Sequence, residues 1–393
     1  MRAAATKYYA SLVGALRLQR DVEPNEAFNH YTAVLENVET VLVWALVDSE
    51  DVESGAALAA DMAPYWIETG RYADARRFLN AAIAESAALS RRRILDTLEA
   101  AIEVAAAGAD TDHLEELAER LRVETGSSND GAEVARVMLA LALARQARAR
   151  YDEAASLFHH ATNAFRIARD SRSLARALIG WSEIVVEQRG DIPQALSMLD
   201  EASDAARKGG STSLVLMVVS EIAEMWAQRG DESQAIEVIH DVAAACQELG
   251  DDASVGWTTL LLARAELRRD PIVGRMHARD ALERLRLHAH PGRLASAFEL
   301  SASIAIDGND DESAARLLAF AGTLRHTHGV AGSLRERREN GRLAEIIERR
   351  MDRISHDRAV REGRAMSLDA ALHRALGDGK ISVADVSGPL IPA

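Results

Sequence analysis

Four histidines near the C-terminal end are the residues whose type and spacing come closest to a chemical site. The stretch LHAH holds His288 and His290, and the stretch RHTH holds His326 and His328. If both stretches end stacked helices, they lie about 10 Å apart, which allows a transition-metal site. However, residues two apart do not share a helix face, and a histidine in a last helical turn already interacts favourably with the helix dipole. We therefore predict no metal site and keep these four histidines as the weak metal candidates.

Other signatures of catalysis do not occur in the sequence. It has no GxxxxGK[ST] phosphate loop, GxGxxG, HExxH, GxSxG or CxxC motif. Carboxylates stand beside arginines at helical spacing, as in EELAERLR (residues 115–122), which is typical of solvated helix faces. The single cysteine, Cys246, lies in the apolar run VAAACQEL and is predicted to be a small buried residue. We predict a protein that is not an enzyme, with no catalytic residues and no cofactor.

Composition narrows the class of protein. The chain has 393 residues, of which 48% are hydrophobic and 4% aromatic, with only 7 prolines, so helix is favoured almost everywhere. The net charge of −15 argues against direct binding to nucleic acid or to an anionic membrane. No apolar run approaches the roughly 20 residues of a membrane span, and no signal peptide is recognisable. With one thiol, a cytoplasmic location is predicted.

A repeat of about 40 residues organises the helices. Five stretches carry a turn residue, a polar pair and an alanine that opens an amphipathic helix; the alanines are Ala75, Ala154, Ala195, Ala235 and Ala314. Their spacings are single or double steps of one period, and weaker copies occur near Leu114 and at 276–278. Repeats of this length are stacked helical hairpins. The alanine is small because paired helices approach closely there. Glycine and aspartate in the turns suit helix C-caps and N-caps.

The predicted fold is all-α: a right-handed α-solenoid of tetratricopeptide-like hairpins. We expect a helical cap at residues 1–50, about seven hairpins at 51–329, a second helical cap at 330–377 and a flexible tail at 378–393, together forming one continuous solenoid domain. Trp66 and Trp226 are separated by four periods, so we expect them to pack between hairpins and not to stack on a ligand.

Both ends of the chain resemble one family in the order of their motifs. Near the start these are Glu36-Asn37, Trp44-Ala45-Leu46, Trp66, Gly70-Arg71-Tyr72 and Arg76-Arg77-Phe78-Leu79; near the end they are Ala314–Leu318, Arg325, Gly329 and EGRAMSLDAALHRAL (residues 362–376). The chain resembles the helical-repeat domain of bacterial signal-transduction ATPases, the LuxR-type and AfsR-like transcriptional regulators. In that family the domain follows an ATPase module and often precedes a DNA-binding helix-turn-helix; the sequence contains the motifs of neither.

Three hypotheses on function follow. The first is a binding module in signal transduction or transcription regulation, with a protein partner or small effector in a concave groove and the output on a separate ATPase or DNA-binding regulator. The second is a constitutive scaffold or accessory subunit of a biosynthetic or regulatory complex. The third is an enzyme with a site in the groove, metal-dependent through the histidines. The partner, the contact residues and self-association through the end hairpins stay open.

Overall fold

Helices make up all of the regular structure that is described. The computed structural model describes residues 2–20, 23–126, 128–288, 291–330, 332 and 334–376, and these residues contain no strand. Before the repeats come α1 (Arg2–Gln19), α2 (Pro24–Leu42) and a π-helical turn, η1 (Val43–Val47). After the repeats come α17 (Leu334–Arg350), α18 (Arg353–Ala365) and α19 (Leu368–Leu376). The tail predicted for 378–393 lies outside the described residues. None of the described helices is long and apolar enough to span a membrane.

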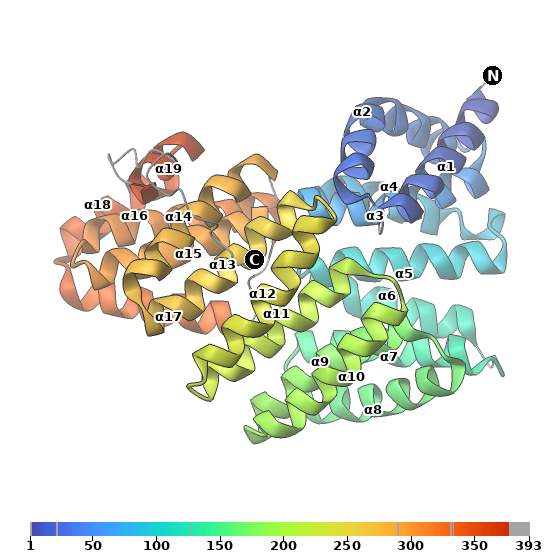
Figure 1. Cartoon of the computed structure of the whole chain (residues 1–393). Coiled ribbons are helices and arrows are strands. Elements are labelled where there is room, and N and C mark those ends of the chain that lie inside the picture. The colour runs from blue at the N-terminus through green and yellow to red at the C-terminus, as the bar shows by residue number, and fades with distance from the viewer. Residues whose placement is uncertain are drawn as a thin grey trace. The chain divides into compact units, whose positions relative to one another are not determined.

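Between these ends, first and second helices alternate with a constant period (Figure 1). The first helices are α3 (Val52–Thr69), α5 (Arg91–Ala107), α7 (Gly131–Ala147), α9 (Ser171–Arg189), α11 (Thr212–Gln228), α13 (Asp252–Arg269) and α15 (Pro291–Asp307). The second helices are α4 (Tyr72–Ala84), α6 (Thr111–Thr125), α8 (Tyr151–Ala168), α10 (Ile192–Lys208), α12 (Glu232–Glu248), α14 (Pro271–His288) and α16 (Asp311–His328). Successive first helices begin at a nearly even spacing of about 40 residues, which is the length of one helical-hairpin repeat. The predicted all-α repeat fold and its period are confirmed.

The chain divides into two compact units. The first contains the residues up to Arg229 together with Glu248–Asp251, and the second contains Gly230–Gln247 and the described residues from Asp252 onward. Within the first unit each helix from α3 to α11 packs on the next, and within the second unit the same holds from α13 to α16.

A small residue at the fourth position of every second helix except α6 sets how closely the helices pack. The five predicted alanines all occupy this position, and all are fully buried: Ala75, Ala154, Ala195, Ala235 and Ala314. In α6 the position holds the buried Leu114, as predicted.

The copy predicted at 276–278 lies in α14, but its packing position comes two to four residues earlier. Gly274 occupies the fourth position of α14, whereas Met276 is exposed and Ala278 is buried. A Cβ atom on Gly274 would lie 2.5 Å from the backbone nitrogen of Leu267 in α13, so even alanine is too large there. The alanine pattern does not identify this position, because this helix pair requires a still smaller residue.

The turns carry the predicted caps. Gly70 and Gly190 end α3 and α9 in the left-handed conformation, with φ of 68° and 61°. Asp191 follows directly and its side chain accepts a hydrogen bond from the backbone of Gln194, at the start of α10. Each turn thus satisfies backbone groups that helix ends leave without partners.

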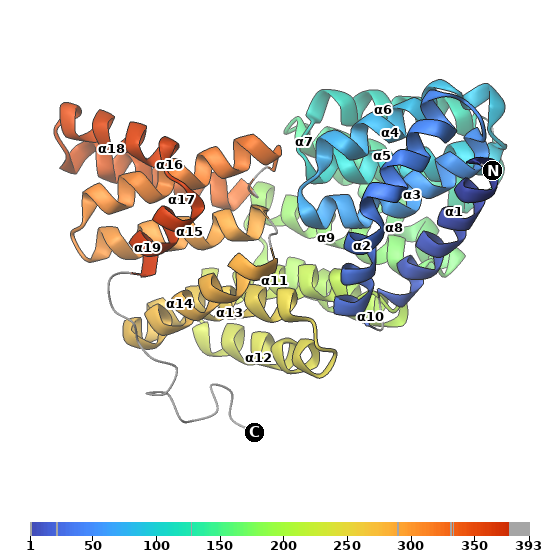
Figure 2. The ribbon, with the colours of Figure 1, turned by 90° about the horizontal axis from the view of Figure 1, so that it is seen from above.

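The C-terminal motif of the resemblance is a packing device. Gly363 of α18 lies directly on α16, where a Cβ atom would come within 2.8 Å of the Arg316 Cα atom, and both views show these helices side by side (Figures 1 and 2). The neighbouring Glu362 accepts a 2.7 Å hydrogen bond from Arg316. In α19, Ala371 and Leu372 are buried in the core of the second unit. Glu362 and Gly363 therefore attach α18 to α16, and the apolar residues of α19 attach the last helix to the core.

A buried ion-pair network in the second unit also joins four helices. Arg325 of α16 donates two hydrogen bonds, of 2.7 and 2.9 Å, to the carboxylate of Glu299 in α15. It also lies 3.3 Å from the carboxylate of Glu336 in α17, which Arg264 of α13 approaches to 3.5 Å. Burial raises the pKa of Glu299, and Arg325 opposes that shift. The arginine-rich helix α17 thus contributes a buried carboxylate, Glu336, to the core of the second unit.

Replacing Gly363 with alanine tests the contact between α16 and α18. We expect Gly363→Ala to lower the thermal unfolding temperature, because the added methyl group meets helix backbone that cannot move aside cheaply. Gly341→Ala is the matched control, since a Cβ atom at Gly341 of α17 meets nothing within 4 Å. It should be neutral or stabilising by about 0.5–1 kcal/mol, because alanine favours helix. Equal behaviour of the two variants by circular dichroism would contradict the packing role.

Replacing Arg325 with leucine tests the buried network. Arg325→Leu leaves the carboxylates of Glu299 and Glu336 without their shared guanidinium, which should cost about 3–5 kcal/mol of unfolding free energy. Arg349→Leu removes only a pair exposed to solvent, with Glu345, and should cost less than about 1 kcal/mol. Chemical unfolding measures both. A loss as small for Arg325 as for Arg349 would show that the network contributes little.

Candidate functional site

The histidine candidates are only partly described. α14 ends at His288 and α16 ends at His328, as the hairpin interpretation expects. The side chain of His288 and the whole of His290 lie outside the described residues, and His326 is exposed. No three described His, Cys, Asp or Glu side chains are grouped so that they could hold a metal ion. A metal site shared by all four histidines would include residues outside the described part of the chain.

The tryptophans of the repeat pack against protein. Trp66 is fully buried and stacks on Phe78 of α4, with ring centroids 6.0 Å apart. Trp226 lies under the guanidinium of Arg229, 4.9 Å from the ring centroid. Trp66 follows the packing interpretation, whereas Trp226 is half-buried, and its packing between hairpins stays a prediction.

The clearest candidate surface is formed by the first helices of the first unit. We call it the inner face and define it by Glu99 and Glu103 of α5, Arg136 and Gln146 of α7, and Arg176 and Glu183 of α9. Glu99 accepts a 3.2 Å hydrogen bond from Arg136, and Gln146 donates a 2.8 Å hydrogen bond to Glu183. These contacts join neighbouring first helices, so all three helices present their side chains to one surface.

An ion pair between α5 and α9 also lies on this face. Arg176 donates to Glu103 although α7 stands between their helices. The two side chains therefore reach over α7 on the side of the inner face. Three successive first helices are thus linked by polar contacts on one surface.

Glu183 stands out on this face. Its side chain is exposed to solvent, and desolvation by the protein around it raises the pKa of its carboxyl above the ordinary value, while the hydrogen bond from Gln146 lowers this pKa in part. Among the described residues, Gln146 is the only hydrogen-bond donor to the Glu183 carboxylate, and it bonds to Oε2. No described arginine, lysine or histidine forms an ion pair with this carboxylate. The two other acids on the face, Glu99 and Glu103, each have an arginine partner.

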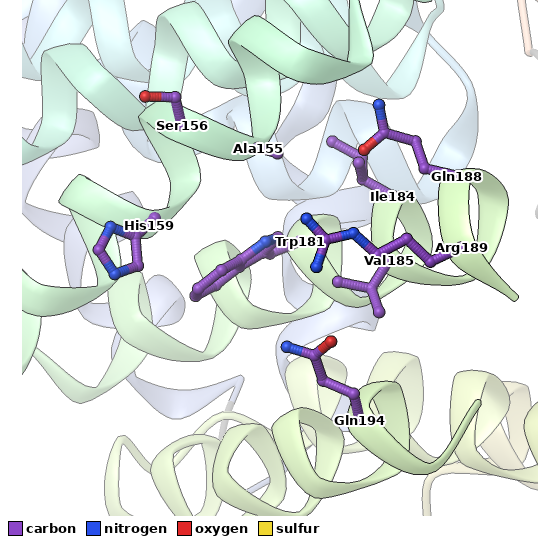
Figure 3. A pocket seen from close by; sticks show the side chains of 9 residues that line it. All are labelled: Ala155, Ser156, His159, Trp181, Ile184, Val185, Gln188, Arg189 and Gln194. Atoms are coloured by element: carbon purple, nitrogen blue, oxygen red, sulfur yellow. The ribbon is translucent and has the colours of Figure 1, made fainter. Parts of the chain in front are cut away.

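A small pocket lies elsewhere in the same unit, between α8, α9 and α10 (Figure 3). Its volume is about 240 Å³. Trp181 forms part of its wall, with the ring of His159 edge-on at 5.3 Å, and Ile184 and Val185 add apolar surface. Because ligand pockets usually measure about 300–1,000 Å³, this pocket suits a single side chain better than a cofactor.

The sequence contains a signal for the inner face in the register of its repeats. Arg136 and Arg176 are one period apart, as are Leu143 and Glu183, so the repeat relates positions on successive helices. Aligning the first helices in this register identifies the residues of one face. The register does not predict the pairing of Glu103 with Arg176, because these two residues lie on first helices that are not consecutive.

The desolvation of Glu183 predicts how a glutamine at this position changes stability. Since the pKa of this carboxyl in the folded chain is raised above the ordinary 4.5, the charged form costs stability, and that cost grows as the pH rises above about 4.5. Glu183→Gln should therefore raise the thermal unfolding temperature at pH 8 more than at pH 5. Glu103→Gln, the matched control, removes an ion pair and should not raise it at either pH. A pH-independent effect of Glu183→Gln would contradict the assignment.

Comparison with known proteins supports the fold. No protein-family model matches the sequence, and no curated protein matches it either. Aspartyl phosphate phosphatase F from Bacillus subtilis has a similar structure, with a TM-score of 0.53, 11% identity, and coverage of 84% of this chain and 96% of that one. A Rap protein complexed with competence and sporulation factor has a TM-score of 0.49 and 13% identity, over 88% of this chain and 99% of that one. The apo form of the quorum sensor NprR from B. thuringiensis has a TM-score of 0.45 and 13% identity, over 87% of this chain and 99% of that one. Because so few residues are identical, the first likeness shows a shared tetratricopeptide-like helical-repeat fold.

Proposed function

We propose that this chain is a non-catalytic binding module whose inner face holds a protein or effector partner. The observation that carries the proposal is the inner face, which three successive first helices form together, with an unneutralised carboxylate, Glu183, at its surface. Helical-repeat stacks commonly use the concave surface of the stack for binding, because each hairpin adds surface without changing the core of its neighbours.

The biological setting is part of the same proposal. The order of motifs from Glu36 to Leu376 resembles the repeat domain of LuxR-type and AfsR-like regulators, which favours bacterial signal transduction or transcription regulation in the cytoplasm. In this setting a partner bound on the inner face changes the activity of a separate regulator. The motifs themselves are structural: Arg325 and Gly363 hold helices together and contribute nothing to the inner face.

A comparative pull-down tests the proposal. The tagged full chain is incubated with lysate of the source organism, and bound proteins and small molecules are identified by mass spectrometry. Glu183→Lys reverses a charge on the inner face, whereas Asp204→Lys makes the same change at an exposed position of α10. Circular dichroism first establishes that both variants fold.

We expect a partner that the wild type and Asp204→Lys retain and Glu183→Lys loses. An ATPase or DNA-binding regulator among such partners supports the signalling role, and subunits of a biosynthetic complex support a scaffold instead. Partners retained equally by all three proteins would show that the inner face is not the binding surface.

A further inference from the structure

The repeat register explains why Glu183 lacks a counter-ion. Glu103 receives its cation from Arg176, which lies two first helices further along the chain. The residues that follow Arg176 in the same register are Met217 in α11 and then Trp257 in α13, each one period further along. Neither side chain carries a charge. Glu183 lies two periods after Glu103, in the equivalent position of the repeat. The arginine that neutralises Glu103 therefore has no equivalent for Glu183.

The apolar residue that replaces the arginine is left partly in solvent. Met217 of α11 is 50% exposed, although methionine is usually buried. Met217 occupies on α11 the register position of Arg136 and Arg176, and α11 is the first helix that follows α9, which carries Glu183. An exposed apolar side chain together with a carboxylate on neighbouring first helices matches a long basic side chain, which has an aliphatic stem and a cationic end.

The carboxylate also has unused capacity to accept hydrogen bonds. Gln146 occupies Oε2, and Oε1 has no hydrogen-bond partner among the described residues. An ionised carboxylate offers about four lone-pair sites, so a guanidinium or ammonium group can bind alongside Gln146. A cation would also offset the desolvation that raises the pKa of Glu183. An anionic ligand would increase the repulsion and is disfavoured.

We propose that Glu183 is the anchor for a lysine or arginine side chain of a peptide segment bound on the inner face, with the stem of that side chain against Met217. This proposal rests on the proposed function and specifies the chemistry of its partner. The bound cation takes the place that Arg176 holds beside Glu103, so the partner completes a pattern that the chain itself leaves incomplete.

A peptide library provides the test. A positional-scanning library of N-acetylated, C-amidated octapeptides is captured on the immobilised full chain at physiological ionic strength, and the strongest sequence is then titrated in solution. The proteins compared are the wild type, Glu183→Gln and Asp204→Asn, which removes the same charge from the exposed surface of α10. A second peptide carries norleucine in place of the enriched basic residue.

We expect one position enriched in arginine or lysine, and binding that Glu183→Gln weakens by about 10- to 100-fold, as for loss of a charged hydrogen bond. Asp204→Asn should change the affinity less than about twofold. Norleucine should weaken binding strongly for the wild type and little for Glu183→Gln, because the two changes remove the same interaction.

Three results would overturn the anchor. The first is that the captured peptides are enriched in a sequence with no basic position. The second is that Glu183→Gln and Asp204→Asn weaken peptide binding equally, which indicates attraction to the net charge of −15. The third is that no peptide sequence is enriched at all. The first leaves the proposed function intact, because a partner can still depend on the inner face in the pull-down. Failure of the proposed function is recognised separately, by partners that Glu183→Lys and Asp204→Lys retain equally.

Discussion

The close approach of paired helices at the fourth position of each second helix is the contact on which the rest of the repeat depends. Where the side chain is alanine, or glycine in α14, the helices come near enough for the neighbouring apolar residues to interlock. Interiors packed at this density tolerate little change in volume. The position therefore fixes the register of each second helix against its neighbours, and that register repeats with every hairpin along the chain.

A constant register has a consequence for electrostatics. Residues at equal positions of successive first helices face the same surface, so charges placed once per period build a charged face. Arg136 and Arg176 neutralise Glu99 and Glu103, and the change from arginine to Met217 ends that pattern. The repeat thus places the side chains of successive first helices on one face. The loss of the periodic arginine at Met217 leaves a carboxylate on that face without a counter-ion.

The fold could be predicted from the sequence because its determinants are local and periodic. The five alanines, the glycine and aspartate caps and the helix lengths all follow from residue size and backbone preference within one hairpin. Gly274 was missed because glycine at a packing position is indistinguishable in sequence from glycine in a turn. Arg325 was recognised as a motif residue, but no motif in the sequence pairs it with Glu299 or Glu336. Contacts such as those of Arg325 and Glu103 depend on tertiary packing, which a single sequence does not encode in any short pattern.

The ion pair between Glu103 and Arg176 also has a meaning for the evolution of this chain. Solenoids commonly grow or shrink by duplication or loss of a whole hairpin, because each hairpin contacts mainly its neighbours. Here one bond reaches over an intervening first helix, so an extra hairpin between α5 and α9 would separate its two partners and leave opposite charges without each other. This ion pair therefore favours a fixed number of hairpins between α5 and α9. Insertion of a hairpin should be tolerated better outside residues 91–189 than within them.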